Sequence, residues 1–304
     1  MRRPVLIPAL IALSLCAPPL GAQVRRSPTF ESRPLRAPLV LPMQILNGRP
    51  VIMLAIGAHA PVPFIVDTGA LGNVVSASLA AGLDLPSIGD AMVGDPAGDP
   101  QPAEIFLASS LRLGDLTLPD IPLIALGNES LFESIGAPGV LSTTVFMGNV
   151  VTFDFAASEI RVTPGSLPDS DGVIPFATDQ VVPNGTLRVG DVTVAADIDT
   201  GNGRPTFLPR ALMEQLTLSA PPVPDTVRMV TGAYEVLRSE AAVPVKLEDV
   251  LLSSHEVLFQ SRFDRANVGT PALLGLTLSV DQANRRYWLG RGQEPGSIRG
   301  AGSG

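Results

Sequence analysis

The chain has 304 residues, of which 45% are hydrophobic and 16% are charged, so it has enough apolar material for a core and too little charge for a disordered protein. Glycine (29) and proline (30) make about one residue in five, which favours many short strands joined by turns over long helices. The formal net charge of -8 argues against a surface that binds nucleic acid or an anionic membrane. These values predict a mainly β protein of two domains or lobes that binds no nucleic acid.

The N-terminal segment has the pattern of an export signal. Met1 is followed by two arginines, residues 4–20 are apolar or small, and small residues precede Gln23. We expect residues 1–22 to be a cleaved signal peptide and the protein to be periplasmic or secreted. Anchoring in the membrane by this stretch is the alternative, which its four prolines disfavour. Cleavage removes Cys16, the sole cysteine, and so excludes disulfides, cysteine-ligated zinc and thiol catalysis.

Composition divides the rest of the chain into two β-rich blocks with polar segments around them. The segment before the first block is rich in proline and arginine, the one between the blocks has linker composition, and the C-terminal one is rich in glycine. We expect a flexible tail or short pro-segment at 23–38, an N-terminal lobe at 39–163, a linker at 164–172, a C-terminal lobe at 173–290 and a disordered tail at 291–304.

The two blocks repeat the same features in the same order. Each begins with an Asn-Gly pair typical of a turn, Asn47-Gly48 and Asn184-Gly185, followed by a strand-like run. A second strand then ends in an Asp-Thr-Gly triplet, 67–69 in the first block and 199–201 in the second, with the two acids 132 residues apart. This order predicts a duplicated fold.

Further features of the two blocks also correspond. Short helical segments are expected at 77–83 and 209–216. A Met-Val pair stands before a glycine in each block, and an apolar pair follows later, Val140-Leu141 in the first and Leu273-Leu274 in the second.

Two acids held at such corners can perform metal-free hydrolysis. A glycine turn fixes the backbone of an acid at the end of an apolar strand, and pseudo-twofold packing of two lobes would bring Asp67 and Asp199 face to face. Two carboxyl groups at close range cannot both ionise, so one keeps a proton. The ionised group can then accept a proton from water while the protonated group hydrogen-bonds the carbonyl that the water attacks.

At these residues the chain resembles the aspartic proteases, and more closely the bacterial retropepsin-like type with two lobes in one chain. The resemblance covers nearly all of residues 40–290. It implies a mainly β, bilobal pepsin/retropepsin-like fold of two pseudo-twofold-related, β-barrel-like lobes with short helices. It also implies catalytic roles for Asp67 and Asp199. The positions that follow each acid would support the site: Thr68, Gly69 and Ala70 in the first lobe, Thr200, Gly201 and Asn202 in the second.

The family also carries two apolar residues and a glycine under each catalytic loop. The second lobe fits this pattern at Leu273-Leu274-Gly275, whereas Ser142 stands at the glycine position of the first lobe. Twelve positions separate Ser142 from Asp154 but six separate Gly275 from Asp281, so we expect the second lobe to be trimmed there.

Two glycine-containing hairpins are expected to act as flaps over the substrate. Gly94 and Gly98 mark the first, and Gly232 and Tyr234 the second, although Tyr234 could equally serve only to pack the hairpin. Ala70 lacks the hydroxyl that pepsin-type enzymes usually have after the triplet. The pKa values of the pair should therefore stay higher, which predicts a weakly acidic optimum.

The favoured function is an aspartic endopeptidase that acts on peptide or protein substrates as a monomer, without a cofactor or metal. His59 and His255 are interpreted as surface residues because neither has a second ligand at metal-binding spacing. A non-catalytic peptide-binding or inhibitor protein on the same fold remains an alternative. A glycoside hydrolase with two carboxylates is disfavoured by the few aromatic residues.

Overall fold

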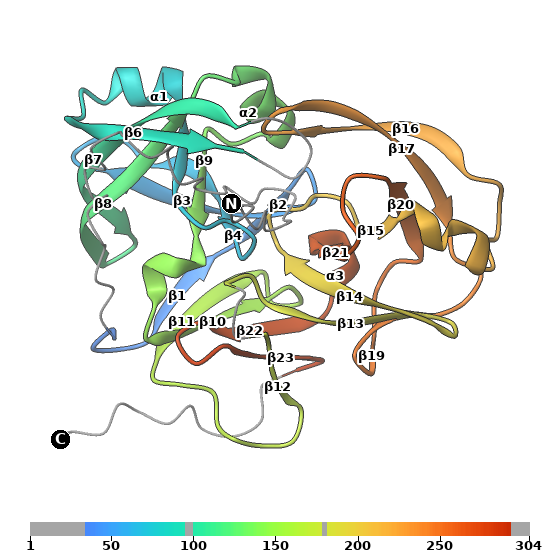
Figure 1. Ribbon diagram of the computed structural model, residues 1–304. Coiled ribbons are helices and arrows are strands. Elements are labelled where there is room, and N and C mark those ends of the chain that lie inside the picture. Colours follow the sequence, from blue (N-terminus) through green and yellow to red (C-terminus); the bar gives the residue numbers. More distant parts are fainter. Residues whose placement is uncertain (1–33, 95–99, 178–180, 293–304) are drawn as a thin grey trace, which may run out of the picture.

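The computed structural model describes residues 34–94, 100–177 and 181–292. Strands dominate and the helices are short, which confirms the predicted mainly β class (Figure 1). In Figure 1 the blue-to-green first half lies on the left, the yellow-to-red second half on the right, and a sheet shared by both lies below them. The predicted signal peptide lies outside the described residues. Within the described ranges no helix is long and apolar enough to cross a membrane.

The first lobe is built on an eight-stranded sheet of order β2-β3-β4-β9-β5-β8-β7-β6. Because β3 also pairs with β7, the sheet curls back on itself, as expected for a barrel-like lobe. Its elements are β2 (Gln44–Leu46), β3 (Arg49–Ile56), β4 (Val62–Asp67), β5 (Val74–Ser76), α1 (Ala77–Gly82), β6 (Ser87–Val93), β7 (Gln101–Leu113), β8 (Leu116–Leu126), α2 (Glu129–Ile135), β9 (Gly139–Ser142) and the 3-10 helix η1 (Thr143–Phe146).

The second lobe is built on a nine-stranded sheet of order β16-β17-β20-β15-β21-β14-β13-β18-β19. Its elements are β13 (Asn184–Val189), β14 (Val192–Asp199), β15 (Thr206–Pro209), the 3-10 helix η2 (Arg210–Gln215), β16 (Val223–Met229), β17 (Gly232–Glu240), β18 (Val245–Leu247), β19 (Val250–Leu251), β20 (Glu256–Gln260), β21 (Ala266–Gly269) and α3 (Thr270–Leu273). Both predicted helical segments are therefore helical, the second as η2.

A six-stranded sheet of order β1-β11-β10-β22-β23-β12 joins the halves. Its strands are β1 (Leu39–Pro42), β10 (Asn149–Asp154), β11 (Glu159–Pro164), β12 (Val173–Pro175), β22 (Thr277–Asp281) and β23 (Arg286–Gly290). At its centre β10 pairs antiparallel with β22, where the hydroxyls of Thr152 and Ser279 lie 2.9 Å apart. Residues 164–172, predicted as a linker, are tied to this sheet because Leu167 is buried and its backbone N–H donates to Asp281 Oδ2.

The structure corrects the predicted alignment of the two lobes. In each lobe the strand that ends in the catalytic-type acid pairs in parallel with another strand, which places Asp67 opposite Ser142 and Asp199 opposite Gly269. Gly269, and not Gly275, is therefore the counterpart of Ser142. With this alignment Asp154 follows Ser142 by twelve positions and Asp281 follows Gly269 by twelve, so the second lobe is not trimmed.

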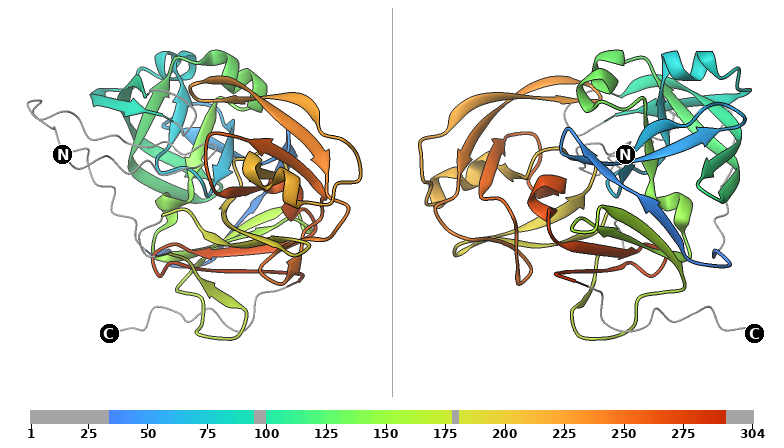
Figure 2. Two further views of the ribbon diagram at one scale, coloured as in Figure 1. Left: turned by 45° about the vertical axis from the view of Figure 1, so that its right-hand side comes forward. Right: turned by 180° about the vertical axis from the view of Figure 1, so that it is seen from behind.

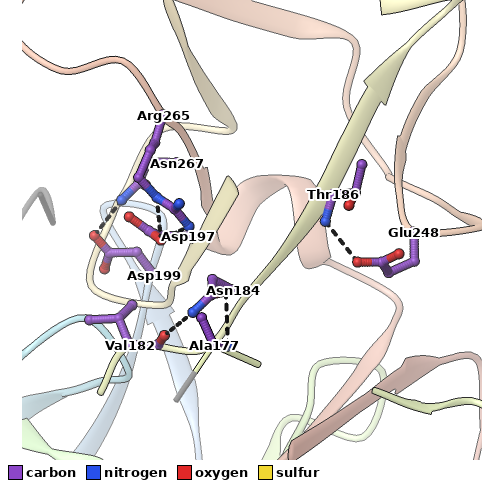
Figure 3. Close-up of polar contacts among 9 residues, drawn as sticks. All are labelled: Ala177, Val182, Asn184, Thr186, Asp197, Asp199, Glu248, Arg265 and Asn267. Carbon is purple, nitrogen blue, oxygen red and sulfur yellow. Dashed lines mark hydrogen bonds and ion pairs between the residues drawn. The ribbon is translucent and has the colours of Figure 1, made fainter. Parts of the chain in front are cut away.

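The turn predicted at Asn184-Gly185 is also wrong, since both residues belong to β13. The Asn184 side chain accepts a hydrogen bond from the Ala177 N–H and donates to the Val182 carbonyl (Figure 3). A Cβ on Gly185 would meet the Tyr287 hydroxyl and a carboxylate oxygen of Glu248, so this glycine serves a close approach. The corresponding pair Asn47-Gly48 does form a turn, in which both residues have positive φ.

Candidate active site

The two Asp-Thr-Gly triplets meet where the lobes face each other. Asp67 ends β4 and Asp199 ends β14, and both side chains are fully buried. A Cβ on Gly69 would lie 2.7 Å from Cγ of Asp199, and a Cβ on Gly201 would collide with the Asp67 carboxyl. Each triplet therefore needs glycine so that the carboxyl group of the other lobe can approach its backbone.

Thr68 and Thr200 link the two lobes by four reciprocal hydrogen bonds. Each threonine N–H donates to the other threonine's Oγ1 at 3.0 Å. Each hydroxyl in turn donates to a carbonyl of the opposite lobe, that of Ile198 at 2.7 Å and that of Val66 at 2.8 Å. All these groups are buried, so the bonds hold the two acids in a fixed relative position.

The hydrogen bonds around Asp67 involve one carboxyl oxygen. Its Oδ1 accepts the N–H of Gly69 at 2.7 Å and, across the lobe boundary, that of Gly201 at 3.2 Å. Its Oδ2 is buried and has no hydrogen-bond partner among the described residues. An orphaned buried oxygen favours the protonated carboxyl, which can donate as well as accept.

Asp199 differs from Asp67 because both of its carboxyl oxygens accept hydrogen bonds. The Asn202 N–H donates to Oδ1 at 3.1 Å. The Asn267 side-chain amide donates to Oδ2 at 2.9 Å (Figure 3). The Asn267 amide is oriented in turn by a 2.7 Å bond that its Oδ1 accepts from Asn202 Nδ2. These donors favour the ionised form of Asp199.

Burial raises the pKa of Asp67 well above its usual range, and repulsion from Asp199 raises it further. The N–H donors of Gly69 and Gly201 oppose this rise. Ala70 is buried and offers no side-chain donor; its carbonyl instead accepts a 2.6 Å bond from the Ser142 hydroxyl. Ser142 therefore fills the position next to Asp67 and fixes the residue that follows the triplet.

The sequence analysis missed Arg49 and Asn267. Arg49, at the start of β3, donates through Nε to the Gly201 carbonyl at 2.7 Å. Burial lowers its pKa, while the nearby charges of Asp199 and Asp67 act in the opposite direction. Asn267 stands where the family pattern has an apolar residue. The twelve-residue spacing from Gly269 to Asp281, which equals that from Ser142 to Asp154, was the sequence signal that could have identified this segment.

The second predicted flap is the hairpin β16–β17, which reaches from the second lobe over to α2 of the first (Figures 1 and 2). Val230 at its tip is buried in a hydrophobic cluster with first-lobe residues, and its carbonyl accepts a 2.9 Å bond from Asn128 Nδ2. Gly232 follows with φ +153°, a conformation that favours glycine. Tyr234 packs within its own lobe, where the Arg262 guanidinium lies 4.2 Å from its ring centre.

The first predicted flap is the hairpin β6–β7. Gly94 directly follows β6 and is buried, whereas Gly98 lies outside the described residues. Val93 beside it belongs to the same hydrophobic cluster as Val230, so both hairpins are anchored in one cluster.

The two histidines lie in separate places: His59 lines a pocket of the first lobe and His255 a pocket of the second. Across the described ranges, no group of three or more His, Cys, Asp or Glu side chains could hold a metal ion.

Comparison with known proteins bears on the first lobe. Residues 50–145 match the protein family described as Aspartyl protease. The matched segment includes the triplet at Asp67, the parallel strand β9 and Ser142. No curated protein matches the chain. The family match and the mainly β fold together support an aspartic protease of the pepsin/retropepsin superfamily, as the sequence predicted.

Proposed function

We propose that the chain is an aspartic endopeptidase in which Asp67 and Asp199 share one proton and activate water. The observation that carries this proposal is the meeting of two buried carboxyl groups across the lobe boundary. Among the described residues, amide groups donate to both oxygens of Asp199, whereas no N–H or O–H donates to Oδ2 of Asp67. Such a difference separates the acid of a pair from its base.

In the proposed reaction, Asp67 carries the shared proton and Asp199 is ionised. Asp199 accepts a proton from a water molecule as the water oxygen attacks the peptide carbonyl carbon, and Asp67 donates its proton to the carbonyl oxygen. A neutral tetrahedral diol results. One of its hydroxyl protons then returns to Asp67, the proton on Asp199 passes to the peptide nitrogen, and the C–N bond breaks to give an acid and an amine.

The remaining residues hold this arrangement. Thr68 and Thr200 fix the separation of the acids, and Gly69 and Gly201 let the backbones approach. Ala70 and Asn202 fix the loop that follows each triplet. The substrate would lie extended beneath the hairpins that contain Gly94 and Gly232 and bond to them through its backbone. No step requires a cofactor. We further propose that the protein acts as a monomer, since one chain supplies both acids. From the signal pattern of residues 1–22 we also propose that it is exported.

Cleavage of a denatured protein mixture between pH 3 and 7 tests this function. The wild type should cleave with a weakly acidic optimum, because the raised pKa of Asp67 keeps the shared proton in place at higher pH. Asp67→Asn and a statine-type transition-state inhibitor should each abolish cleavage. A folded wild-type chain that cuts nothing at any pH would contradict the proposal and favour a peptide-binding or inhibitor protein.

A further inference from the structure

A pocket of about 350 Å³ opens beside the loop that follows Asp199 and is lined from both lobes. Arg49 and Leu131 line it from the first lobe, and Gly201 and Arg228 from the second. Its size is in the range of sites that hold small ligands or side chains. Because Gly201 also donates its N–H to Asp67, a group bound here lies next to the catalytic loop.

The charge of this pocket is opposite to that of the whole chain. Three arginines line it and no acidic residue does, although the formal charge of the chain is -8. Arg204 is neutralised by an ion pair with Asp225. Arg49 and Arg228 form no ion pair with any described residue. Neither guanidinium is therefore in direct contact with a carboxylate, although the charges of Asp199 and Asp67 act on Arg49.

Arg49 is fixed in place without using its full hydrogen-bonding capacity. Its Nε donates to the Gly201 carbonyl and its Nη1 donates to the Asn47 carbonyl at 2.9 Å, while Nη2 has no partner among the described residues. A Cβ on Gly203 would collide with Nη1, so the glycine makes room for the guanidinium. A guanidinium stays charged even when it is partly desolvated, and it binds carboxylates with defined geometry.

Arg228 lines the pocket from the hairpin. On β16 it is exposed between the buried Val227 and Met229. Leu131, Phe207 and Val227, which are buried, form an apolar part of the pocket lining. The pocket thus suits a short apolar stem that ends in a carboxylate.

We propose that this pocket sets the substrate preference of the peptidase by binding a substrate carboxylate between Arg49 and Arg228. The carboxylate would come from a Glu or Asp side chain near the scissile bond or from a C-terminus a few residues away. This inference rests on the proposed peptidase function. A rigid, partly desolvated guanidinium next to the reacting bond favours such a group more than a surface arginine would.

The test first maps the cut sites of a denatured protein mixture and then compares matched peptides. For each position near the cut there is one pair of peptides, in which one member carries Glu and the other carries Gln. A further pair differs only in ending with a C-terminal carboxylate or a C-terminal amide. We expect the wild type to cleave the carboxylate member of one pair with a kcat/KM about tenfold higher, and less so at high salt. The pair that responds identifies the source of the carboxylate.

Variants assign the preference to the two arginines. Arg228→Gln should reduce the kcat/KM ratio of the carboxylate peptide to its neutral partner from about ten to between about one and about three. Arg228→Glu should favour Lys over Glu at the responsive position. Arg49→Gln should act in the same direction, but it also removes the bonds to the Gly201 and Asn47 carbonyls and so can disturb the fold. The Arg228 variants remove no such bond, so their effect on the preference does not depend on folding. Arg188→Gln is the matched control, because Arg188 pairs with the exposed Asp249 on another surface and lines no part of this pocket.

The outcomes separate this inference from the function on which it rests. Cleavage of every pair at equal rates, or a preference that neither Arg228 variant changes, would overturn the carboxylate pocket and leave the peptidase intact. Absence of cleavage of all peptides and of the protein mixture would overturn the peptidase function itself.

Discussion

At the scale of single residues, the two carboxyl groups of the site differ in the donors around their outer oxygens. The Asn267 amide donates to Oδ2 of Asp199, whereas no N–H or O–H group among the described residues donates to Oδ2 of Asp67. A hydrogen bond from a neutral amide to a carboxylate stabilises the ionised form by about 1.5–3 kcal/mol, which corresponds to roughly one to two pKa units. In the proposed mechanism Asn267 is therefore a positioning residue that fixes which acid holds the proton.

Replacing Asn267 by Leu removes this donor at similar volume. We expect the lower pKa of the kcat/KM profile to rise by about one unit, because the ionised form of the pair loses a stabilising bond. The measurement is the pH dependence of peptide cleavage. Asn73→Leu is the control, since the Asn73 side chain bonds Ser142 and Pro122 and neither acid. An unshifted profile for the Asn267 variant would contradict the assignment.

Asp197 gives a prediction about stability. It is buried two residues before Asp199, and burial raises its pKa to about 6 despite the ion pair with Arg265 (Figure 3). A carboxyl whose folded pKa lies above its unfolded value near 4 favours the folded state while it is protonated. That contribution is complete below about pH 4 and is lost as the pH rises through about 6.

Relative to Asp197→Asn, the wild type should lose stability as the pH rises from 4 to 7, by about 3 kcal/mol at most. Urea unfolding of both proteins at several pH values measures the difference. Asp249→Asn, which also removes one carboxylate but at an exposed site, is the matched control. A stability difference for Asp197→Asn that stays constant with pH would show that burial does not perturb this carboxyl.

At the scale of elements, the parallel partner strands β9 and β21 differ in how they support the loops that follow Asp67 and Asp199. Gly269 of β21 leaves no room for a Cβ, which would meet the backbone carbonyls of Asn202 and Arg204. At the matching position of β9, the Ser142 hydroxyl donates to the Ala70 carbonyl and fills the space. The serine is thus a structural part of the first lobe.

Gly269→Ala should therefore lower the free energy of unfolding by about 3 kcal/mol, because fixed backbone atoms must move. Ser142→Ala should cost about 1–2 kcal/mol, because it removes the bond to the buried Ala70 carbonyl and the cap that the hydroxyl gives to the N–H of Thr144. Gly82→Ala at the end of α1, where a Cβ meets nothing within 4 Å, is the matched control and should have little effect. Denaturant unfolding ranks the three variants. Equal losses of unfolding free energy for Gly269→Ala and Gly82→Ala would contradict the close approach of the Asn202 and Arg204 carbonyls to Gly269.

The hairpin β16–β17 is anchored at its tip by Val230 in the cluster of the first lobe. Val230→Ala removes part of this apolar contact, worth about 1–1.5 kcal/mol, so the tip should open about tenfold more often. Hydrogen exchange of residues 223–240 should accelerate accordingly. Val223→Ala, at the exposed far end of the hairpin, should not change exchange at the tip. Unchanged exchange in both variants would mean that the tip is not held by this contact.

The sequence predicted an element correctly where its own turn residues and apolar runs agreed with the corresponding segment of the other half. The triplets, the short helices and the two hairpins follow from turn chemistry and apolar runs, which act within a few residues. The counterpart of Ser142 was missed because Asn267 interrupts the apolar pattern of β21, and its role depends on Asp199, 68 residues away. Arg49 was missed for the same reason: its partner Gly201 belongs to the other lobe, 152 residues away.

At the scale of the whole molecule, duplication explains how one chain assembles a symmetric site. The central pairing of β10 with β22 and the exchange of hydrogen bonds between Thr68 and Thr200 lie on the same lobe boundary. Both contacts join corresponding segments of the two halves. The acids therefore depend on the packing of the whole chain, and neither lobe alone can hold the pair.

The central claim is that Asp67 and Asp199 act as a unit, and a double-mutant cycle tests it most directly. The kcat/KM of one peptide is measured for the wild type, Asp67→Asn, Asp199→Asn and the double variant, each shown to be folded by its thermal unfolding. Each single variant should lose about a thousandfold or more, and the double variant should lose no more than either single one. Activity within about tenfold of the wild type in either single variant would contradict the shared-proton pair.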